Sequence, residues 1–166
     1  IDNSLGKITF NTILISIISS VFIIITAYMI IFTKNYFNSD ALKKISHAAV
    51  LGYSMPGAII AIGILKLSSS LDSLISLVLI GSTLGLIFAY LVRFFAVAWQ
   101  PIESSMEKQC DSINQASRIL KVRAITSMRK INLPILKNPL LLTFLIVFID
   151  ITKELPLTLI LRPFNF

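Results

Sequence analysis

The chain alternates long uncharged stretches with shorter polar ones. Three stretches carry no charged residue over 26, 18 and 20 positions: Ile8–Thr33, Ala48–Leu65 and Ser73–Val92. A helix needs about 20 apolar residues to cross the hydrocarbon of a bilayer, so each stretch is expected to be a membrane span. A fourth, at about Pro139–Leu161, is apolar at both ends and holds Asp150, Lys153 and Glu154 near its middle. The pattern predicts an all-α, polytopic transmembrane helix bundle with about four spans.

Composition agrees with a membrane location. Hydrophobic residues make up 55% of the chain, charged residues 14%, and the mean hydropathy is +0.85, which is outside the range of soluble globular domains. The net charge of +7 does not indicate nucleic-acid binding, because Lys and Arg flank the apolar stretches and are not interleaved with aromatic residues. With one Cys and one His, the chain offers no disulfide and no catalytic or metal-binding arrangement. We therefore expect neither an enzyme nor a cofactor bound by this chain itself.

The Lys and Arg residues are unevenly distributed over the two sides of the predicted spans. Loops 34–47 and 93–138 hold eleven of the fifteen, and the other side has three: Lys7, Lys66 and Arg162. Because cytoplasmic loops are enriched in Lys and Arg, we place both loops in the cytoplasm and the start of the chain outside. Arg93 is expected to snorkel to the cytoplasmic surface. Residues 1–166 then form one transmembrane domain with a cytoplasmic loop at about 99–138.

Within this loop, the segment from Gln115 to Pro134 is basic and amphipathic. Ser112 and Gln115 fit a capping box, which predicts a helix start. Apolar residues recur at three- and four-residue steps, as on one face of a helix: Ile113, Ala116, Leu120, Ala124, Met128 and Ile131. Pro134 predicts the helix end at Leu133. Periodicity alone leaves two roles open, an interfacial helix on anionic lipid or a docking helix for a protein.

The same segment resembles the cytoplasmic motif of inner-membrane permease subunits of binding-protein-dependent ABC importers. That motif has Glu-Ala-Ala, a Gly four residues after the second Ala, and a hydrophobic residue and Leu-Pro near its end. The spacing is kept at seven positions, although the opening Glu, the second Ala and the Gly are replaced: Gln115, Ala116, Ser117, Lys121, Ile131, Leu133 and Pro134. The resemblance implies that these seven residues couple the chain to a cytoplasmic ATPase.

Further stretches resemble the ferric-iron branch of these permeases, and the resemblance covers nearly the whole chain: Leu51–Gly63, Tyr90–Phe95, and Asp150–Pro156 through Leu161–Phe166. It implies a permease subunit that moves ferric iron across the bacterial inner membrane. The implied partners are a periplasmic substrate-binding protein, a second permease half and a cytoplasmic ATP-binding subunit, on which ATP is hydrolysed. One polypeptide of that family usually carries two homologous halves, and we expect this chain to be most of the second half. A same-fold permease for thiamine or a polyamine, and a non-transporting remnant, are the alternatives.

Two departures from the motif bear on its mechanism. Gln115 can still cap the helix but lacks the carboxylate, which typically contributes about 0.3–1 kcal/mol at a helix N-terminus. Lys121 resists the positive φ that a Gly would permit between two short helices. We therefore expect one longer helix through Lys121, with impaired coupling as the alternative.

The charges of the fourth stretch form a second candidate site. Asp150, Lys153 and Glu154 are spaced to share one helical side, and Pro156 should free the carbonyl of Thr152 and kink the helix. Intramembrane charges usually face a cavity or each other, so Asp150, Lys153, Glu154 and Pro156 are candidates to line a translocation path. Their oxygen atoms would suit a ferric ion. The alternatives are an Asp150–Lys153 ion pair that orders the bundle, and contacts with the other permease half.

Overall fold

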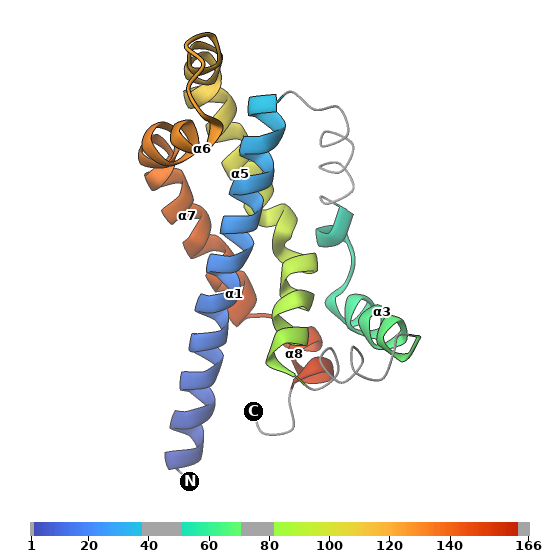
Figure 1. Ribbon diagram of the computed structural model, residues 1–166. Coiled ribbons are helices and arrows are strands. Elements are labelled where there is room, and N and C mark those ends of the chain that lie inside the picture. Colours follow the sequence, from blue (N-terminus) through green and yellow to red (C-terminus); the bar gives the residue numbers. More distant parts are fainter. Residues whose placement is uncertain (1, 38–50, 71–81, 163–166) are drawn as a thin grey trace.

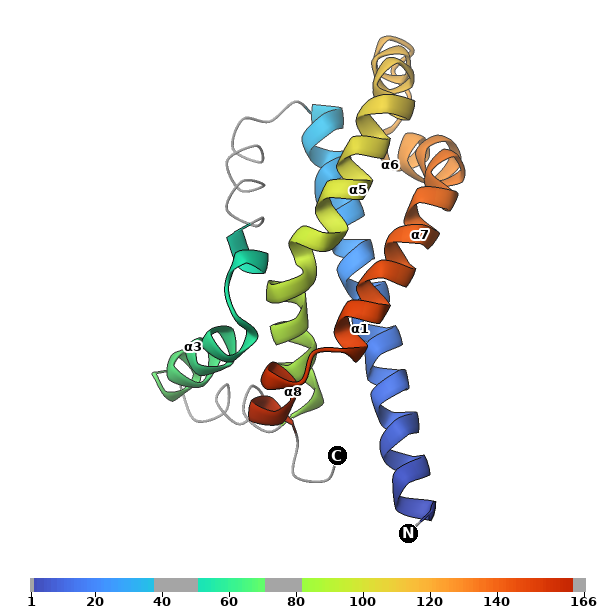
Figure 2. The ribbon, with the colours of Figure 1, turned by 180° about the vertical axis from the view of Figure 1, so that it is seen from behind.

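The computed structural model describes residues 2–37, 51–70 and 82–162, in which all regular elements are helical. Three long helices form its centre: α1 (Asp2–Phe37), α5 (Thr83–Ile119) and α7 (Leu133–Thr152). The helices α1 and α5 run in the same direction and α7 runs back beside them (Figures 1 and 2). Three segments are long and apolar enough to cross a membrane: Gly6–Phe37, Thr83–Gln109 and Ala124–Thr152. The described part of the chain is thus all-α, and its three candidate spans indicate a multi-pass membrane protein.

The first predicted span lies within α1, where several hydroxyl side chains bond to the backbone of the helix itself. The hydroxyl groups of Thr12, Ser16 and Ser20 each donate to the carbonyl oxygen four residues earlier, at 2.9, 2.7 and 2.6 Å. A hydroxyl bonded in this way leaves no unsatisfied donor in the hydrocarbon. Helix α1 can therefore carry a row of hydroxyl groups on an otherwise apolar sequence.

The helix α5 extends the third predicted span well past its expected end. It begins after the N-cap Ser82, whose Oγ accepts a hydrogen bond from the Gly85 amide at 3.1 Å. It continues for 37 residues, so the expected end at Val92 is wrong. Residues 73–81 of that predicted span lie outside the described part of the chain.

The separate helix predicted to begin at Ser112 is also wrong, because Ser112 lies inside α5. Three large side chains, Trp99, Ile102 and Met106, are almost fully buried and continue the helical spacing of the apolar half of α5. Their stripe packs against α1 and α7. The same spacing of buried positions continues past Ser112 at Asn114 and Ser117, so the capping-box sequence lies within one continuous helix.

The second predicted span, Ala48–Leu65, is not one continuous helix. Its described part consists of a 3-10 turn, η1 (Leu51–Ser54), and the 13-residue helix α3 (Gly57–Ser69), separated at Met55 and Pro56. Pro56 takes extended backbone angles (φ −56°, ψ 139°), and this starts a new helix in place of continuing the old one. At about 1.5 Å per residue, α3 is about 20 Å long, which is shorter than the hydrocarbon core. It packs against α5 and the short helix α8 (Pro156–Leu161).

The fourth predicted span is wrong in both boundaries. Helix α7 starts before Pro139 and ends at Thr152, and α8 begins at Pro156. Pro156 has no N–H to bond the carbonyl of Thr152, and it occupies the first turn of α8, where that donor is not needed. The expected kink is therefore a complete break, and the charged residues lie at this break or just before it.

The end of the bundle that holds the C-terminal ends of α1 and α5 and the start of α7 is strongly basic (Figure 1). The described basic residues on these segments are Lys34, Lys108, Arg118, Lys121, Arg123, Arg129, Lys130 and Lys137. Lys34 pairs with Glu103 and lies over the Trp99 ring. The described basic residues of the two predicted loops therefore lie at one end of the bundle, with the exception of Arg93. Arg93 does not belong to this end, because it lies in the N-terminal third of α5 and its side chain pairs with Glu154. The prediction that Arg93 snorkels to the cytoplasmic surface is wrong.

Candidate functional sites

The first candidate site is the hairpin formed by residues 112–134. It comprises the last turns of α5, a turn at Leu120–Arg123, the helical segments α6 (Ala124–Thr126) and η2 (Ser127–Asn132), and the start of α7. The segment after the turn runs across the bundle, and α6 and η2 are seen nearly end-on in both ribbon views (Figures 1 and 2). The hairpin is therefore a compact projection at the basic end.

The turn of the hairpin is a Schellman motif around Lys121. The Val122 amide donates to the Ser117 carbonyl at 3.0 Å, and the Lys121 amide donates to the Arg118 carbonyl at 3.1 Å. This pattern places the residue after the C-cap in the left-handed region, usually as Gly. Lys121 has φ 52° and is the one non-Gly residue with positive φ among those that the structure describes. The expectation of one longer helix through Lys121 is therefore wrong.

Pro134 predicted that the helix ends at Leu133, and this prediction is wrong. Residues Ser127–Asn132 form a π-helical segment that leads directly into α7, and Pro134 lies in the first turn of that helix. Pro is tolerated in a first turn, because its missing N–H has no intrahelical partner to satisfy there. The wider π turn lets the chain pass into α7 without a break.

Two buried asparagines join the arms of the hairpin. Asn132 Nδ2 donates to Asn114 Oδ1 at 2.9 Å, and it also lies 3.2 Å from the Ser127 carbonyl oxygen. Asn114 and Asn132 are 3% and 0% exposed, so this amide contact is shielded from water. A hydrogen bond in such surroundings fixes one geometry, because a buried unpaired amide is costly. The end of α5 is thereby held against the start of α7.

Two tyrosines of α1 hold the hairpin from its other side. The Tyr28 hydroxyl donates to the Met128 carbonyl, and the Tyr36 hydroxyl donates to the Val122 carbonyl, both at 2.8 Å. Sequence reasoning missed these residues. A signal was present, since Tyr28, Phe32 and Tyr36 are spaced by four and lie on one face of a helix.

The tip of the hairpin exposes large apolar side chains. Ile119 and Leu120 are 80% and 74% exposed, and Ile125 is 50% exposed. The hairpin also carries five exposed basic residues: Arg118, Lys121, Arg123, Arg129 and Lys130. The predicted amphipathic face is thus wrong at Leu120, because this side chain is exposed. The interior of the hairpin is instead filled by polar residues.

The seven motif residues lie on this one projection, with different exposures. Gln115, Ala116, Lys121, Leu133 and Pro134 are exposed, Ile131 is half-buried and Ser117 is 4% exposed. A small side chain at position 117 fits the closed interior of the turn, where its carbonyl also accepts the Val122 bond. The hairpin therefore presents the exposed motif residues next to its apolar tip.

The second candidate site is an ion pair at the break between α7 and α8. Arg93 Nε lies 3.1 Å from Glu154 Oε2, and Arg93 Nη1 donates to the Met55 carbonyl at 2.6 Å. Thr158 Oγ1 donates to the Glu154 carbonyl, and it lies 2.6 Å from the Tyr90 hydroxyl. This cluster joins α5, α8 and the segment before α3.

The predicted Asp150–Lys153 ion pair is not formed. Within the described part of the chain, Glu154 is the acid that pairs at the α7–α8 break, and its partner is Arg93. Lys153 is exposed. The three charged residues also do not share one helical side, because Glu154 lies beyond the end of α7. Pro156 begins α8 beside the Arg93–Glu154 pair.

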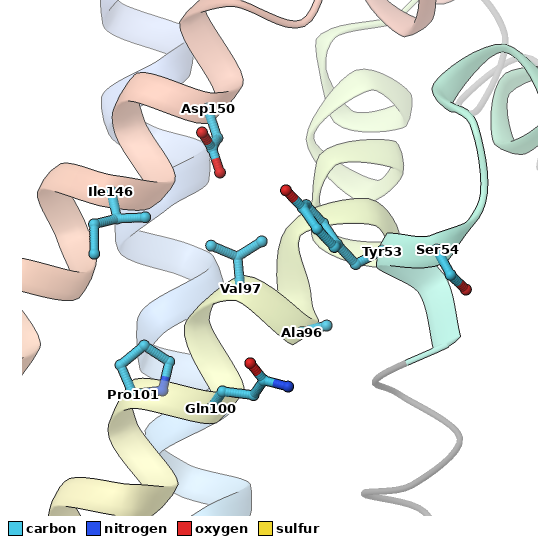
Figure 3. Close-up of a pocket in the computed structure, with 8 residues that line it drawn as sticks. All are labelled: Tyr53, Ser54, Ala96, Val97, Gln100, Pro101, Ile146 and Asp150. Carbon is cyan, nitrogen blue, oxygen red and sulfur yellow. The ribbon is translucent and has the colours of Figure 1, made fainter.

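Asp150 instead lines a cavity of about 510 Å³ between η1, α5 and α7 (Figure 3). Its carboxylate and the Tyr53 hydroxyl point toward each other from opposite walls, and Gln100 lines the cavity from α5. Among the described residues, no group of three or more His, Cys, Asp and Glu side chains could hold a metal ion. Asp150 is therefore a single carboxylate in a largely apolar cavity.

A scan against models of known protein families finds no match for the chain, and no curated protein is significantly similar to it.

Proposed function

We propose that the chain is the permease subunit of an ABC importer in the bacterial inner membrane and that its hairpin docks on a cytoplasmic ATPase. The observation that carries this proposal is the left-handed backbone at Lys121. The motif of these permeases has Gly at that position, and Gly is the residue that adopts positive φ without strain. A chain that makes the same turn with a Lys retains the shape that the Gly would provide.

The surface of the hairpin suits protein docking. Ile119 and Leu120 are among the most exposed large apolar residues of the described chain, and they lie at the basic end, which the charge distribution assigns to the cytoplasm. An exposed apolar patch with a polar rim is typical of a protein contact. Docking on the ATPase would bury Ile119 and Leu120 and leave the basic residues at the rim.

The contacts of the hairpin provide a route for movement into the membrane. Tyr28 and Tyr36 join the hairpin to α1, and the Asn114–Asn132 contact joins α5 to α7. A displacement of the docked hairpin would therefore be transmitted to all three long helices together, as in rigid-body switching. Closure of the ATPase on ATP would tilt these helices and open a path through the membrane.

The cargo follows from the resemblance, which favours ferric iron delivered by a periplasmic substrate-binding protein. A second permease half would complete the path, and ATP would be hydrolysed on the partner ATPase. Thiamine or a polyamine is the alternative cargo, and a non-transporting remnant is the alternative to transport. This chain alone is not expected to transport.

Reconstitution tests the proposal. The full-length protein is placed in proteoliposomes with the ATPase and the binding protein encoded beside it, and ATP-dependent uptake of radiolabelled ferric iron is measured. We expect uptake, and we expect Leu120→Glu to abolish it by placing a charge in the docking contact. Glu107→Gln, at an exposed position of α5 outside the hairpin, is the control. If the chain docks on the ATPase but no iron is taken up, ferric iron is not the cargo. If there is neither docking nor uptake, the chain is not the permease subunit of an importer.

A further inference from the structure

The cavity at Asp150 has the size and lining of a small-molecule site. Its volume of about 510 Å³ lies in the range of ligand pockets, which are mostly apolar with a few polar groups. Val97, Pro101 and Ile146 form apolar walls, while Asp150, Tyr53 and Gln100 supply the polar groups (Figure 3). These residues come from three different elements, so the cavity exists only in the folded chain.

The charge of Asp150 is not neutralised by the described chain. No described residue forms an ion pair or a hydrogen bond with its carboxylate, which is partly exposed to the cavity. Lys153 is exposed and unpaired in the same part of the chain, and Arg93 is already paired with Glu154. A carboxylate at membrane depth without a counter-charge favours a bound cation.

The lining discriminates between kinds of cation. A hard metal ion is held by about six oxygen ligands, whereas the side chains that line this cavity offer one carboxylate, one amide, one phenol hydroxyl and the Ser54 hydroxyl. An ammonium group needs only one carboxylate and gains from an aromatic ring such as that of Tyr53. The apolar walls would contact the hydrocarbon part of an organic ligand.

The cavity lies near mid-height of the bundle, since its α5 lining residues are close to the centre of the candidate span Thr83–Gln109. Asp150 is in the last turn of α7, about 26 Å along the helix from Leu133 at a rise of 1.5 Å per residue. The hairpin and the basic end are at the opposite end of α7. Asp150 is therefore separated from the hairpin by almost the whole length of α7.

We infer that this cavity binds an organic monocation, with its ammonium group at Asp150 and its apolar part against Val97, Pro101 and Ile146. The inference goes beyond the proposed function, because it assigns a ligand class to this cavity whichever cargo the importer carries. The binding itself requires only this chain.

Equilibrium dialysis of the full-length protein in nanodiscs, with radiolabelled benzyltrimethylammonium as the probe, tests the inference. We expect saturable binding that Asp150→Asn weakens about 30-fold or more, as for loss of one partner of a charge pair. Asp150→Glu should keep most of the affinity, and Tyr53→Leu should lower it about threefold. Glu107→Gln is the matched control, since it removes an exposed carboxylate outside the cavity. Neopentylbenzene, the neutral analogue of the probe, should not compete.

Equal binding to wild type and Asp150→Asn would overturn the inference, as would displacement of the probe from wild type by ferric citrate but not by sodium citrate at the same concentration. Because dialysis needs no ATPase, its outcome is separate from the docking test. If the probe binds but the ATPase does not dock, the cation site is supported and the proposed importer function is contradicted. Docking without binding would contradict the cation site alone.

Discussion

Arg93 and Glu154 form an ion pair that joins the N-terminal third of α5 to the break between α7 and α8. Their side chains are 17% and 9% exposed, and Arg93 also donates to the Met55 carbonyl ahead of α3. A Cβ at Gly57 would collide with Glu154 Oε1 and lie 3.3 Å from Arg93 Cζ. One ion pair thus positions the two short helices, α3 and α8, on the long ones.

Removal of one partner of this pair is expected to destabilise the fold. A buried charge left without its partner costs about 3–5 kcal/mol, and the remaining exposure of Arg93 places Glu154→Gln near the lower value. The measurement is the free energy of unfolding in mixed micelles. Lys153→Gln, which changes an exposed neighbour, should stay within about 0.5 kcal/mol. Equal stability of Glu154→Gln and Lys153→Gln would show that the pair is not formed.

Two glycines of α3 provide a matched test of the packing around this pair. Gly57→Ala should lower stability by about 1–3 kcal/mol, because its Cβ would displace the Glu154 carboxylate from its contact with Arg93. Gly63→Ala should be neutral or stabilising by up to about 1 kcal/mol, since nothing lies within 4 Å of its Cβ and Ala favours a helix. Thermal unfolding of both variants in detergent measures the difference, and the opposite order would contradict this placement of α3.

The turn at Lys121 should respond to backbone freedom and not to charge. Lys121→Gly is expected to be about 1 kcal/mol more stable than Lys121→Gln, because both lose the charge but only Gly removes the cost of positive φ. Comparing the unfolding free energies of these two variants isolates the effect. Identical stabilities would indicate that residue 121 does not adopt the left-handed conformation.

The buried amide contact should decide the stability of the hairpin. Asn132→Leu is expected to cost about 1–3 kcal/mol, because it leaves the Asn114 side chain buried without its partner. Hydrogen exchange of the amides of residues 112–134 should accelerate. Asn138→Leu, at an exposed position of α7, is the control and should leave exchange unchanged. Unchanged exchange in Asn132→Leu would show that the Asn114–Asn132 hydrogen bond does not hold the two arms of the hairpin together.

The sequence predicted the helical class, the first span and the basic end, because each depends on composition over many residues. It did not predict the boundaries of the other spans. Pro56 and Pro156 were read within continuous stretches, yet each of them starts a new helix. Hydropathy averages over such breaks, so it cannot separate a span from two short helices.

The hairpin was misread because its burial is the reverse of its hydropathy. Asn114 and Asn132 are buried through their mutual hydrogen bond, while Ile119 and Leu120 are exposed. Apolar periodicity predicts the buried face only where burial follows hydrophobicity. The Arg93–Glu154 pair was missed for a related reason, since it joins residues 61 positions apart.

The contact between the hairpin and an ATPase is the central claim, and photo-crosslinking tests it most directly. In a Cys110→Ala background, which removes the single native cysteine, Leu120→Cys carries a benzophenone label and the protein is reconstituted with the ATPase encoded beside it. We predict crosslinks to the ATPase from position 120 and none from Leu141→Cys, an exposed apolar position on α7. Crosslinks from position 120 to lipid only would contradict the account and assign the hairpin to the membrane surface.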